Sequence, residues 1–348
     1  MRIGIVNQFA PPDEAPTAVL AGELAEHLRA QGHEVELIAC KSGYRKRGGV
    51  RGSRLLHELG AHLTLFWKCL RLRKPDVLLA LSTPAILPAT VDLAARLKRC
   101  RFAHWAMDVY PDVAVALGEL KARGVVHRVS ARLMRRAYRR AAPLVSLTED
   151  MKQVIGQGGE ICPPWPPTTL DWPDTAAPPP GPFTWLYSGN LGRAHLYRPM
   201  LLAQKKLEER GLPVKLIFQG RGHLIPEAKA LAGELGLAGC EFRDYVPREE
   251  LLTSLFDANV LVATQNPQTA GMLWPSKLAV MDHVPRPVLW IGDDQPIARA
   301  TRFSPGDVEG ISDWLEQQLT NPTPPSYSPP PSLPETPFEH WENWIRQE

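Results

Sequence analysis

Two series of short apolar segments, separated by a proline-rich stretch, constrain the fold of this chain more than any other feature. Each apolar segment has the length of one buried strand and is followed by a segment with helical periodicity. The first series opens with a strand at residues 2–6, a helix at 18–30 and a second strand at 34–39, which follows Gly32-His33. Strand, loop, helix and strand in this order are typical of the start of a doubly wound parallel sheet.

The second series shows the same pattern most completely between residues 259 and 292. An apolar strand at 260–263 leads into a polar loop, and Pro275-Ser276 marks a helix start before the next strand at 287–292. A helix that begins at the carboxyl end of a parallel sheet presents unpaired N–H groups, and Lys277 adds a full charge. This pattern predicts a phosphate site, although an ordinary strand-helix-strand unit with a surface lysine would read the same way.

The length of 348 residues accommodates two α/β domains, each with its own core. Proline clusters at two places, and the last aromatic residues recur at helical spacing, which predicts a terminal helix docked across the first domain or a cleft. We therefore predict an N-terminal domain at 1–162, a linker at 163–182, a C-terminal domain at 183–320 and a proline-rich tail with a helix at 321–348.

Composition excludes several classes of protein. The five scattered cysteines form no Cys-x-x-Cys pair, which favours a reducing cytoplasm over a disulfide framework or a zinc site. We find no signal-peptide layout and no apolar run that would span a bilayer. The net charge of +3 is too small to indicate nucleic-acid binding. The fingerprint Gly-x-Gly-x-x-Gly is absent after the first strand, which argues against a nicotinamide or flavin enzyme.

Positive charge concentrates on one predicted helix. Residues 121–140 contain eight cations and no acid. Four arginines share one helical face beside an apolar stripe: Arg128, Arg132, Arg135 and Arg139, next to Val125, Val129, Leu133 and Ala137. This face predicts contact with anionic lipid or a polyanionic substrate, with a solvated basic face as the alternative. The amphipathic, aromatic-rich segment 55–72, flanked by the basic run 45–54, fits a membrane contact and a core helix equally well.

His104 and Asp108 lie where the predicted strand at 102–108 runs into its loop. Open α/β sheets bind their ligands at the carboxyl ends of strands, so both residues are candidates for catalysis. A structural hydrogen-bonding role is the alternative for each.

Motifs in this order and spacing, over nearly the whole chain, resemble those of glycosyltransferase family 4, especially its bacterial polysaccharide and lipid-linked-sugar branch. In the first half they are Asn7-Gln8-Phe9-Ala10-Pro11-Pro12, Gly32-His33-Glu34-Val35, Pro75-Asp76-Val77 and Met107-Asp108-Val109-Tyr110-Pro111-Asp112. In the second half they are Tyr187-Ser188-Gly189-Asn190-Leu191-Gly192, Gln219-Gly220-Arg221-Gly222, Pro275-Ser276-Lys277-Leu278 and Arg286-Pro287-Val288-Leu289. The resemblance implies the GT-B fold, in which two Rossmann-like doubly wound domains face a cleft and a C-terminal helix crosses back.

The resemblance also implies a function. The protein would transfer a sugar from a nucleotide-diphosphate-sugar to an envelope-polysaccharide or lipid-linked acceptor, with retention and without a metal or other cofactor, in the cytoplasm at the inner face of the membrane. His104 and Asp108 would face the sugar and acceptor. The donor would be bound by Ser188, Gly189, Asn190, Gly192, Arg193, Arg221, Ser276 and Lys277.

Some positions depart from the family pattern. The glutamate that usually bonds the donor ribose is replaced by Val280, and a second glutamate that often contacts the sugar is replaced by Met272. The Arg and Lys that often bind the diphosphate are matched by Asn190 and His195. A catalytically impaired GT-B protein that serves as a binding or scaffold partner in polysaccharide assembly is therefore the alternative, and an epimerase of related fold has less support.

Overall fold

The computed structural model describes residues 1–13, 15–40, 54–173, 181–322 and 335–347. These residues form two compact units. The first consists of Met1–Thr168, Gly271–Trp274 and Leu333–Glu348, and the second of Thr169–Ala270 and Pro275–Ser332. The predicted proline-rich segments at 163–182 and 322–337 lie partly outside the described residues, and the basic run at 45–54 lies almost wholly outside them.

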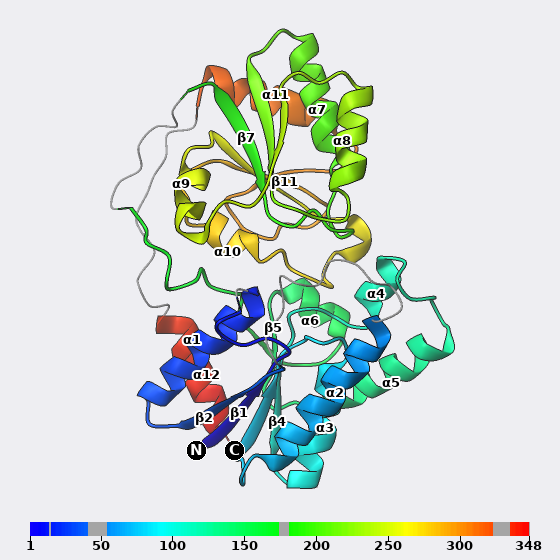
Figure 1. Cartoon of the computed structure of the whole chain (residues 1–348), viewed down its shortest axis with the longest axis vertical. Helices are drawn as coiled ribbons and strands as arrows, with labels where there is room; N and C mark the ends of the chain where they lie inside the picture. Colours follow the sequence, from blue (N-terminus) through cyan, green and yellow to red (C-terminus); the bar gives the residue numbers. More distant parts are fainter. Residues whose placement is uncertain (14, 41–53, 174–180, 323–334, 348) are drawn as a thin grey trace. The chain divides into compact units, whose positions relative to one another are not determined.

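The first unit is built on a six-stranded parallel sheet in the order β2-β1-β3-β4-β5-β6 (Figure 1). Its strands are β1 (Arg2–Val6), β2 (Glu34–Ile38), β3 (Val77–Ala80), β4 (Arg101–Trp105), β5 (Leu144–Ser146) and β6 (Glu160–Ile161). Its helices are α1 (Pro16–Ala30), α2 (Arg54–Arg71), α3 (Leu87–Lys98), α4 (Asp112–Ala116), α5 (Val125–Arg140), α6 (Glu149–Ile155) and α12 (Glu335–Arg346). Helices cover both faces of the sheet, which explains why the strands read as continuous apolar runs.

The C-terminal helix α12 belongs to the first unit, as predicted. Phe338, Trp341 and Ile345 recur at helical spacing and are buried in the core beneath α1. Trp341 packs on Trp105, with ring centroids 5.0 Å apart. The guanidinium of Arg101 donates to the carbonyl of Ile345 at 2.8 Å and so satisfies an unpaired carbonyl at the helix end. The end of the chain therefore completes the core that the first strand begins.

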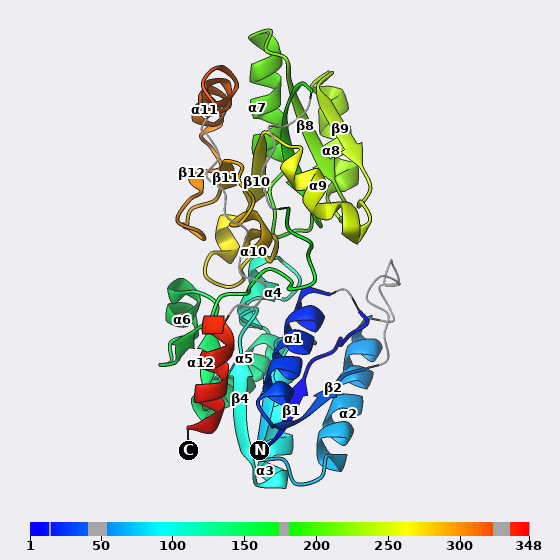
Figure 2. The same cartoon turned by 90° about the vertical axis from the view of Figure 1, so that its left-hand side faces the viewer.

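The second unit repeats the architecture with a parallel sheet in the order β12-β11-β10-β7-β8-β9, which runs from left to right in Figure 2. Its strands are β7 (Phe183–Ser188), β8 (Val214–Gln219), β9 (Cys240–Arg243), β10 (Val260–Thr264), β11 (Val288–Ile291) and β12 (Thr301–Phe303). Its helices are α7 (Arg198–Glu209), α8 (Ile225–Glu234), α9 (Leu251–Phe256), α10 (Lys277–Met281) and α11 (Val308–Thr320). The predicted pair of doubly wound domains is confirmed.

The strand orders place one topological switch point in each unit. In the first sheet the chain order reverses between β1 and β3, and in the second between β7 and β10. Loops leave opposite faces of the sheet at such a point, so a crevice opens at the carboxyl ends of the two strands. Each switch point is therefore a candidate ligand site.

Candidate functional site

The loops after β7 and β8 extend the pairing of these strands beyond the end of the sheet. Gly189 N–H donates to the carbonyl of Gln219 at 2.9 Å, and Leu191 N–H donates to the carbonyl of Arg221 at 2.8 Å. Gly220 has a φ of +137°, and a Cβ at this position would collide with the carbonyl of Gly189. Only glycine allows these two loops, next to the switch point, to approach so closely.

Lys277 reaches over this turn. Its Nζ lies 3.5 Å from the centroid of the Tyr187 ring and 3.3 Å from where a Cβ on Gly189 would stand. The nitrogen is buried and has no hydrogen-bond partner among the described residues. Burial lowers the pKa of Lys277 well below its ordinary value. The sequence predicts an exposed lysine, but the structure encloses its amine at the carboxyl ends of β7 and β10, and no carboxylate in the described part of the chain pairs with it.

His195 lies beside this amine. Its Nδ1 is 2.7 Å from the carbonyl of Thr264 at the end of β10, so Nδ1 carries the proton. Burial, with a smaller contribution from Lys277, lowers the pKa of His195 to about 3. The imidazole is therefore neutral, and its Nε2 is an acceptor. Tyr187 and Thr264 were not predicted as site residues, since nothing in an apolar strand indicates which side chain will face a ligand.

The other predicted donor-binding residues at the end of β7 and in the loop after it make different contacts. Ser188 is buried at the end of β7, where its Oγ accepts from Nε2 of Gln219 at 3.1 Å. Asn190 accepts the Tyr187 hydroxyl through its backbone carbonyl at 2.9 Å. Arg193 lies 3.3 Å from the ring of His223. Gly192 continues the turn.

Arg221 and Ser276 were predicted to bind the donor phosphates, but Arg221 is already ion-paired and Ser276 does not cap a helix. The guanidinium of Arg221 forms a two-pronged ion pair with exposed Asp244, at 2.7 and 2.8 Å, so its charge is already matched. Ser276 is exposed and precedes a helix of five residues without making a side-chain cap. So short a helix contributes little dipole, and the charge at this site therefore comes chiefly from Lys277.

In the first unit, His104 and Asp108 occupy different environments. His104 is enclosed within β4, where its Nδ1 donates to the carbonyl of Ala80 at 2.8 Å and its ring stacks on Tyr138 of α5. Burial lowers the pKa of His104 to about 4. Asp108 follows the end of β4, and burial raises the pKa of its carboxyl to about 6. The Ser82 hydroxyl accepts from the N–H groups of Met107 and Asp108, at 2.8 and 3.3 Å, and fixes this turn.

Comparison with known proteins identifies the domain type. Residues 17–165 match the model of the glycosyl transferase 4-like domain. This chain is a GT-B protein with a glycosyl transferase 4-like domain.

Solved GT-B structures match over most of the chain. The apo lipopolysaccharide outer core galactosyltransferase WaaB has a TM-score of 0.63 at 12% identity, covering 99% of both chains. Sucrose-phosphate synthase from Thermosynechococcus elongatus has a TM-score of 0.67 at 13% identity, covering 99% of this chain and 94% of that one. Anabaena HepE in complex with UDP has a TM-score of 0.61 at 12% identity, covering 92% and 90%. A search of curated proteins gives no match.

The two residues that replace the glutamates of the glycosyltransferase family 4 pattern lie in different units. Val280 is buried in α10. Met272 belongs to the first unit, where its carbonyl accepts from Val109 N–H at 2.7 Å and its side chain packs on the core. The adjacent residues Asp108 and Leu273 form an antiparallel bridge. Met272 therefore holds a structural place beside the candidate residue Asp108.

The basic helix α5 of this GT-B protein meets the core through a side that includes neither the four arginines nor most of the apolar stripe. Its buried residues are Ser130, Met134, Ala137 and Tyr138. The predicted apolar stripe is therefore largely exposed, as Val125 (69% exposed) and Val129 (53%) show. Arg128, Arg132, Arg135 and Arg139 are exposed beside it. Apolar and cationic side chains thus share one surface.

Exposed apolar residues continue onto the neighbouring helices. Figure 1 shows α2, α3 and α5 on the same side of the first sheet, and α3 packs against both of the others. On α2, Leu59, Leu63 and Trp67 follow one helical face and are 52%, 61% and 57% exposed. On α3, Leu93 and Leu97 are also exposed. We call this surface of α2, α3 and α5 the apolar-basic face.

No three His, Cys, Asp or Glu side chains among the described residues are grouped so that they could hold a metal ion. None of the helices in this part of the chain has the length and apolar character needed to cross a bilayer.

Proposed function

We propose that this protein transfers a sugar from a nucleotide-diphosphate-sugar to an envelope-polysaccharide or lipid-linked acceptor, with retention at the anomeric carbon. The glycosyl transferase 4-like domain at residues 17–165 and the GT-B fold support transfer of a glycosyl group. The donor belongs at the carboxyl ends of β7 and β10, and the acceptor belongs to the first unit.

The observation that carries this proposal is the buried amine of Lys277. A buried cation without a partner is unfavourable, and a diphosphate would supply the missing negative charge. As the glycosidic bond breaks, negative charge develops on the leaving diphosphate, and a fixed ammonium stabilises that state. Lys277 thereby supplies, from the protein itself, charge stabilisation that a metal supplies in other transferases.

On the acceptor side, the proposal assigns proton handling to Asp108 rather than to His104. A carboxyl with a pKa of about 6 exchanges a proton readily near neutral pH. The Nδ1 of His104 is occupied by the carbonyl of Ala80, and Tyr138 covers the ring, so His104 positions β4.

The test is a titration of nucleoside diphosphates into the protein, followed by incubation with the matching nucleotide sugars. UDP is the first probe, because the related HepE structure contains it. We expect UDP or another nucleoside diphosphate to bind below millimolar concentration, and its sugar conjugate to be slowly hydrolysed when no acceptor is present. If none of them binds at millimolar concentration, the transferase proposal fails and the scaffold alternative takes its place.

We further propose that the protein acts in the cytoplasm at the inner face of the membrane, with the apolar-basic face on anionic lipid. Helix α5 carries six arginines and no acid. Cations attract the anionic headgroups, and exposed Leu63, Trp67 and Val125 can enter the interface. This orientation would present the first unit to a lipid-linked acceptor.

Replacing Arg128, Arg132, Arg135 and Arg139 together by glutamine should lower binding to anionic vesicles by at least about ten-fold, since each cation near such a surface contributes about 1 kcal/mol. Co-sedimentation with phosphatidylserine-containing vesicles at low and high salt measures the loss. A matched variant neutralises Arg198, Lys205, Lys229 and Arg302 in the second unit, which removes the same charge. Equal loss in both variants would show that net charge alone is responsible.

A further inference from the structure

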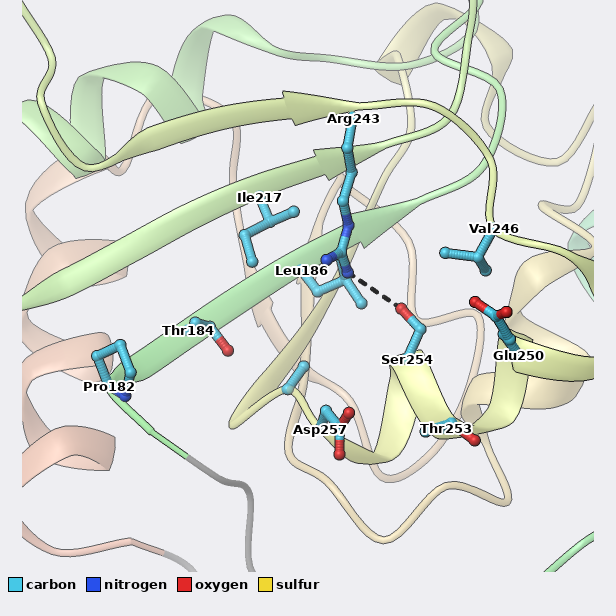
Figure 3. A pocket seen from close by; sticks show the side chains of 11 residues that line it. Pro182, Thr184, Leu186, Ile217, Arg243, Val246, Glu250, Thr253, Ser254 and Asp257 are labelled. Atoms are coloured by element: carbon cyan, nitrogen blue, oxygen red, sulfur yellow. Dashed lines mark hydrogen bonds between the residues drawn. The ribbon is translucent and has the colours of Figure 1, made fainter.

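A row of polar side chains connects the wall of a pocket in the second unit to Ser188. The pocket has a volume of about 410 Å³ and lies between α9 and the sheet face formed by β7, β8 and β9. Figure 3 shows Arg243 reaching from β9 toward Ser254 of α9. The Arg243 Nη2 donates to Ser254 Oγ at 3.1 Å, and Ser254 Oγ donates to Gln219 Oε1 at 2.7 Å. Gln219 Nε2 then donates to Ser188 Oγ at 3.1 Å.

The hydrogen bonds of this relay of Arg243, Ser254, Gln219 and Ser188 run in one direction. An arginine has donors and no acceptor, so the Ser254 oxygen must accept from it. The single hydroxyl proton of Ser254 then goes to Gln219 Oε1, which fixes the orientation of the amide. Its Nε2 therefore faces Ser188, whose oxygen must accept. The hydroxyl proton of Ser188 is left without an acceptor among the described residues.

Ser188 is buried and lies close in the sequence to the residues that contact the Lys277 amine. Ser188 and Gln219 are 8% and 1% exposed, so water competes little for the bonds between them. Leu186 and Ile217, two residues earlier on the same strands, line the pocket on the same sheet face. Ser188 is the last residue of β7 and stands between Tyr187 and Gly189, the two residues against which the Lys277 amine lies.

We propose that Ser188 donates its hydroxyl proton to an oxygen of the diphosphate held by Lys277, and that Gln219, Ser254 and Arg243 are positioning residues that keep this proton available. The inference rests on the proposed function and deepens it. A hydroxyl that already accepts a hydrogen bond is oriented to donate, so it binds an acceptor oxygen without first breaking a bond inside the protein. The Ser188 hydroxyl therefore favours a ligand that places a hydrogen-bond acceptor oxygen beside it.

The probe for the test is UDP. Ser188→Ala should weaken UDP binding by about ten-fold or more, because a hydrogen bond to a charged group is lost. Gln219→Glu should weaken it similarly, because a carboxylate at 219 accepts from Ser254 and from Ser188 and so takes the proton away from the ligand. Gln219→Met, which leaves the Ser188 hydroxyl free to rotate, should change UDP affinity by less than about three-fold while lowering stability to urea.

A double-mutant cycle distinguishes loss of the Ser188 proton from simple charge repulsion between the new carboxylate and the diphosphate. In the Ser188→Ala background the proton is absent, so Gln219→Glu should weaken UDP by at most about two-fold more. Ser312→Ala, which truncates another buried serine of the second unit, should leave the affinity unchanged. This control shows that loss of a buried hydroxyl is not enough.

Three results would overturn the relay while leaving the proposed function intact: unchanged UDP affinity in Ser188→Ala, an equal effect of Gln219→Glu in both backgrounds, or equal losses in Gln219→Met and Gln219→Glu. Failure of the wild-type protein to bind UDP or any other nucleoside diphosphate would overturn the relay and the proposed function together.

Discussion

Replacing Lys277 by methionine is expected to stabilise the unliganded protein and, at the same time, to weaken diphosphate binding by at least about thirty-fold. Methionine has nearly the length of lysine and no charge, so it removes a buried amine that has no hydrogen-bond partner among the described residues. Burial of an unpaired polar group costs about 1–3 kcal/mol, and the free energy of unfolding should rise by that order. Loss of a desolvated contact between opposite charges costs about 2–5 kcal/mol of binding energy. Urea unfolding and UDP titration measure the two effects.

Lys205→Met is the matched control, because Lys205 is a half-exposed lysine on α7 of the same unit. It should change stability by less than about 0.5 kcal/mol and leave UDP affinity unchanged. If Lys277→Met destabilises the protein, the amine has a partner in solution. If it leaves UDP affinity unchanged, the diphosphate binds elsewhere.

The dependence on pH gives the Lys277 prediction a second readout. The pKa of Lys277 is lowered by burial, and a bound diphosphate favours the ammonium form. UDP affinity should therefore fall as pH rises through the lowered pKa, by about ten-fold per pH unit above it, and Lys277→Met should remove this dependence. Without ligand the sign is opposite. Between the lowered pKa and the ordinary value the unfolded chain binds more protons, so stability rises with pH.

Trp341→Ala is expected to lower the free energy of unfolding of the first unit by about 3–5 kcal/mol, as for other fully buried large aromatic side chains. Trp341 is 0% exposed, and its ring packs on Trp105 and Trp344 at centroid distances of 5.0 and 5.5 Å. Its loss leaves a cavity between α12 and the sheet, and α12 joins the first core chiefly through Phe338, Trp341 and Ile345.

Trp341→Phe is the control, because it keeps an aromatic ring of similar size in the core and removes the indole N–H. We expect it to cost less than half as much as the alanine variant. Two-step urea unfolding, with the transition of the second unit as an internal reference, distinguishes the effect from a global one. A loss below about 1 kcal/mol for Trp341→Ala would show that α12 contributes little to the first core.

The sequence alone determined the kind of fold and the order of its elements. Apolar segments of strand length alternate with helical periodicity from residue 2 onward, and this alternation depends on local spacing that any chain with these residues must satisfy. The Tyr187-Ser188-Gly189 turn could be recognised in the same way, because glycine at such a turn reflects a backbone requirement. The aromatic spacing in the last residues likewise predicted α12.

Only the tertiary structure decided which side chains are enclosed and which are paired. The amine of Lys277 is buried and Arg221 is matched by Asp244, although the sequence predicted both cations to bind the donor. Helix α5 buries Met134 and Tyr138 and exposes Val125. The side of α5 that is buried depends on where α3 and the sheet contact it, and the spacing of residues within α5 does not determine that. Burial and pairing depend on residues distant in the sequence, and the pKa of a group depends on burial. The chemistry of the site, unlike its fold, was therefore set by packing between strands and helices rather than by local pattern.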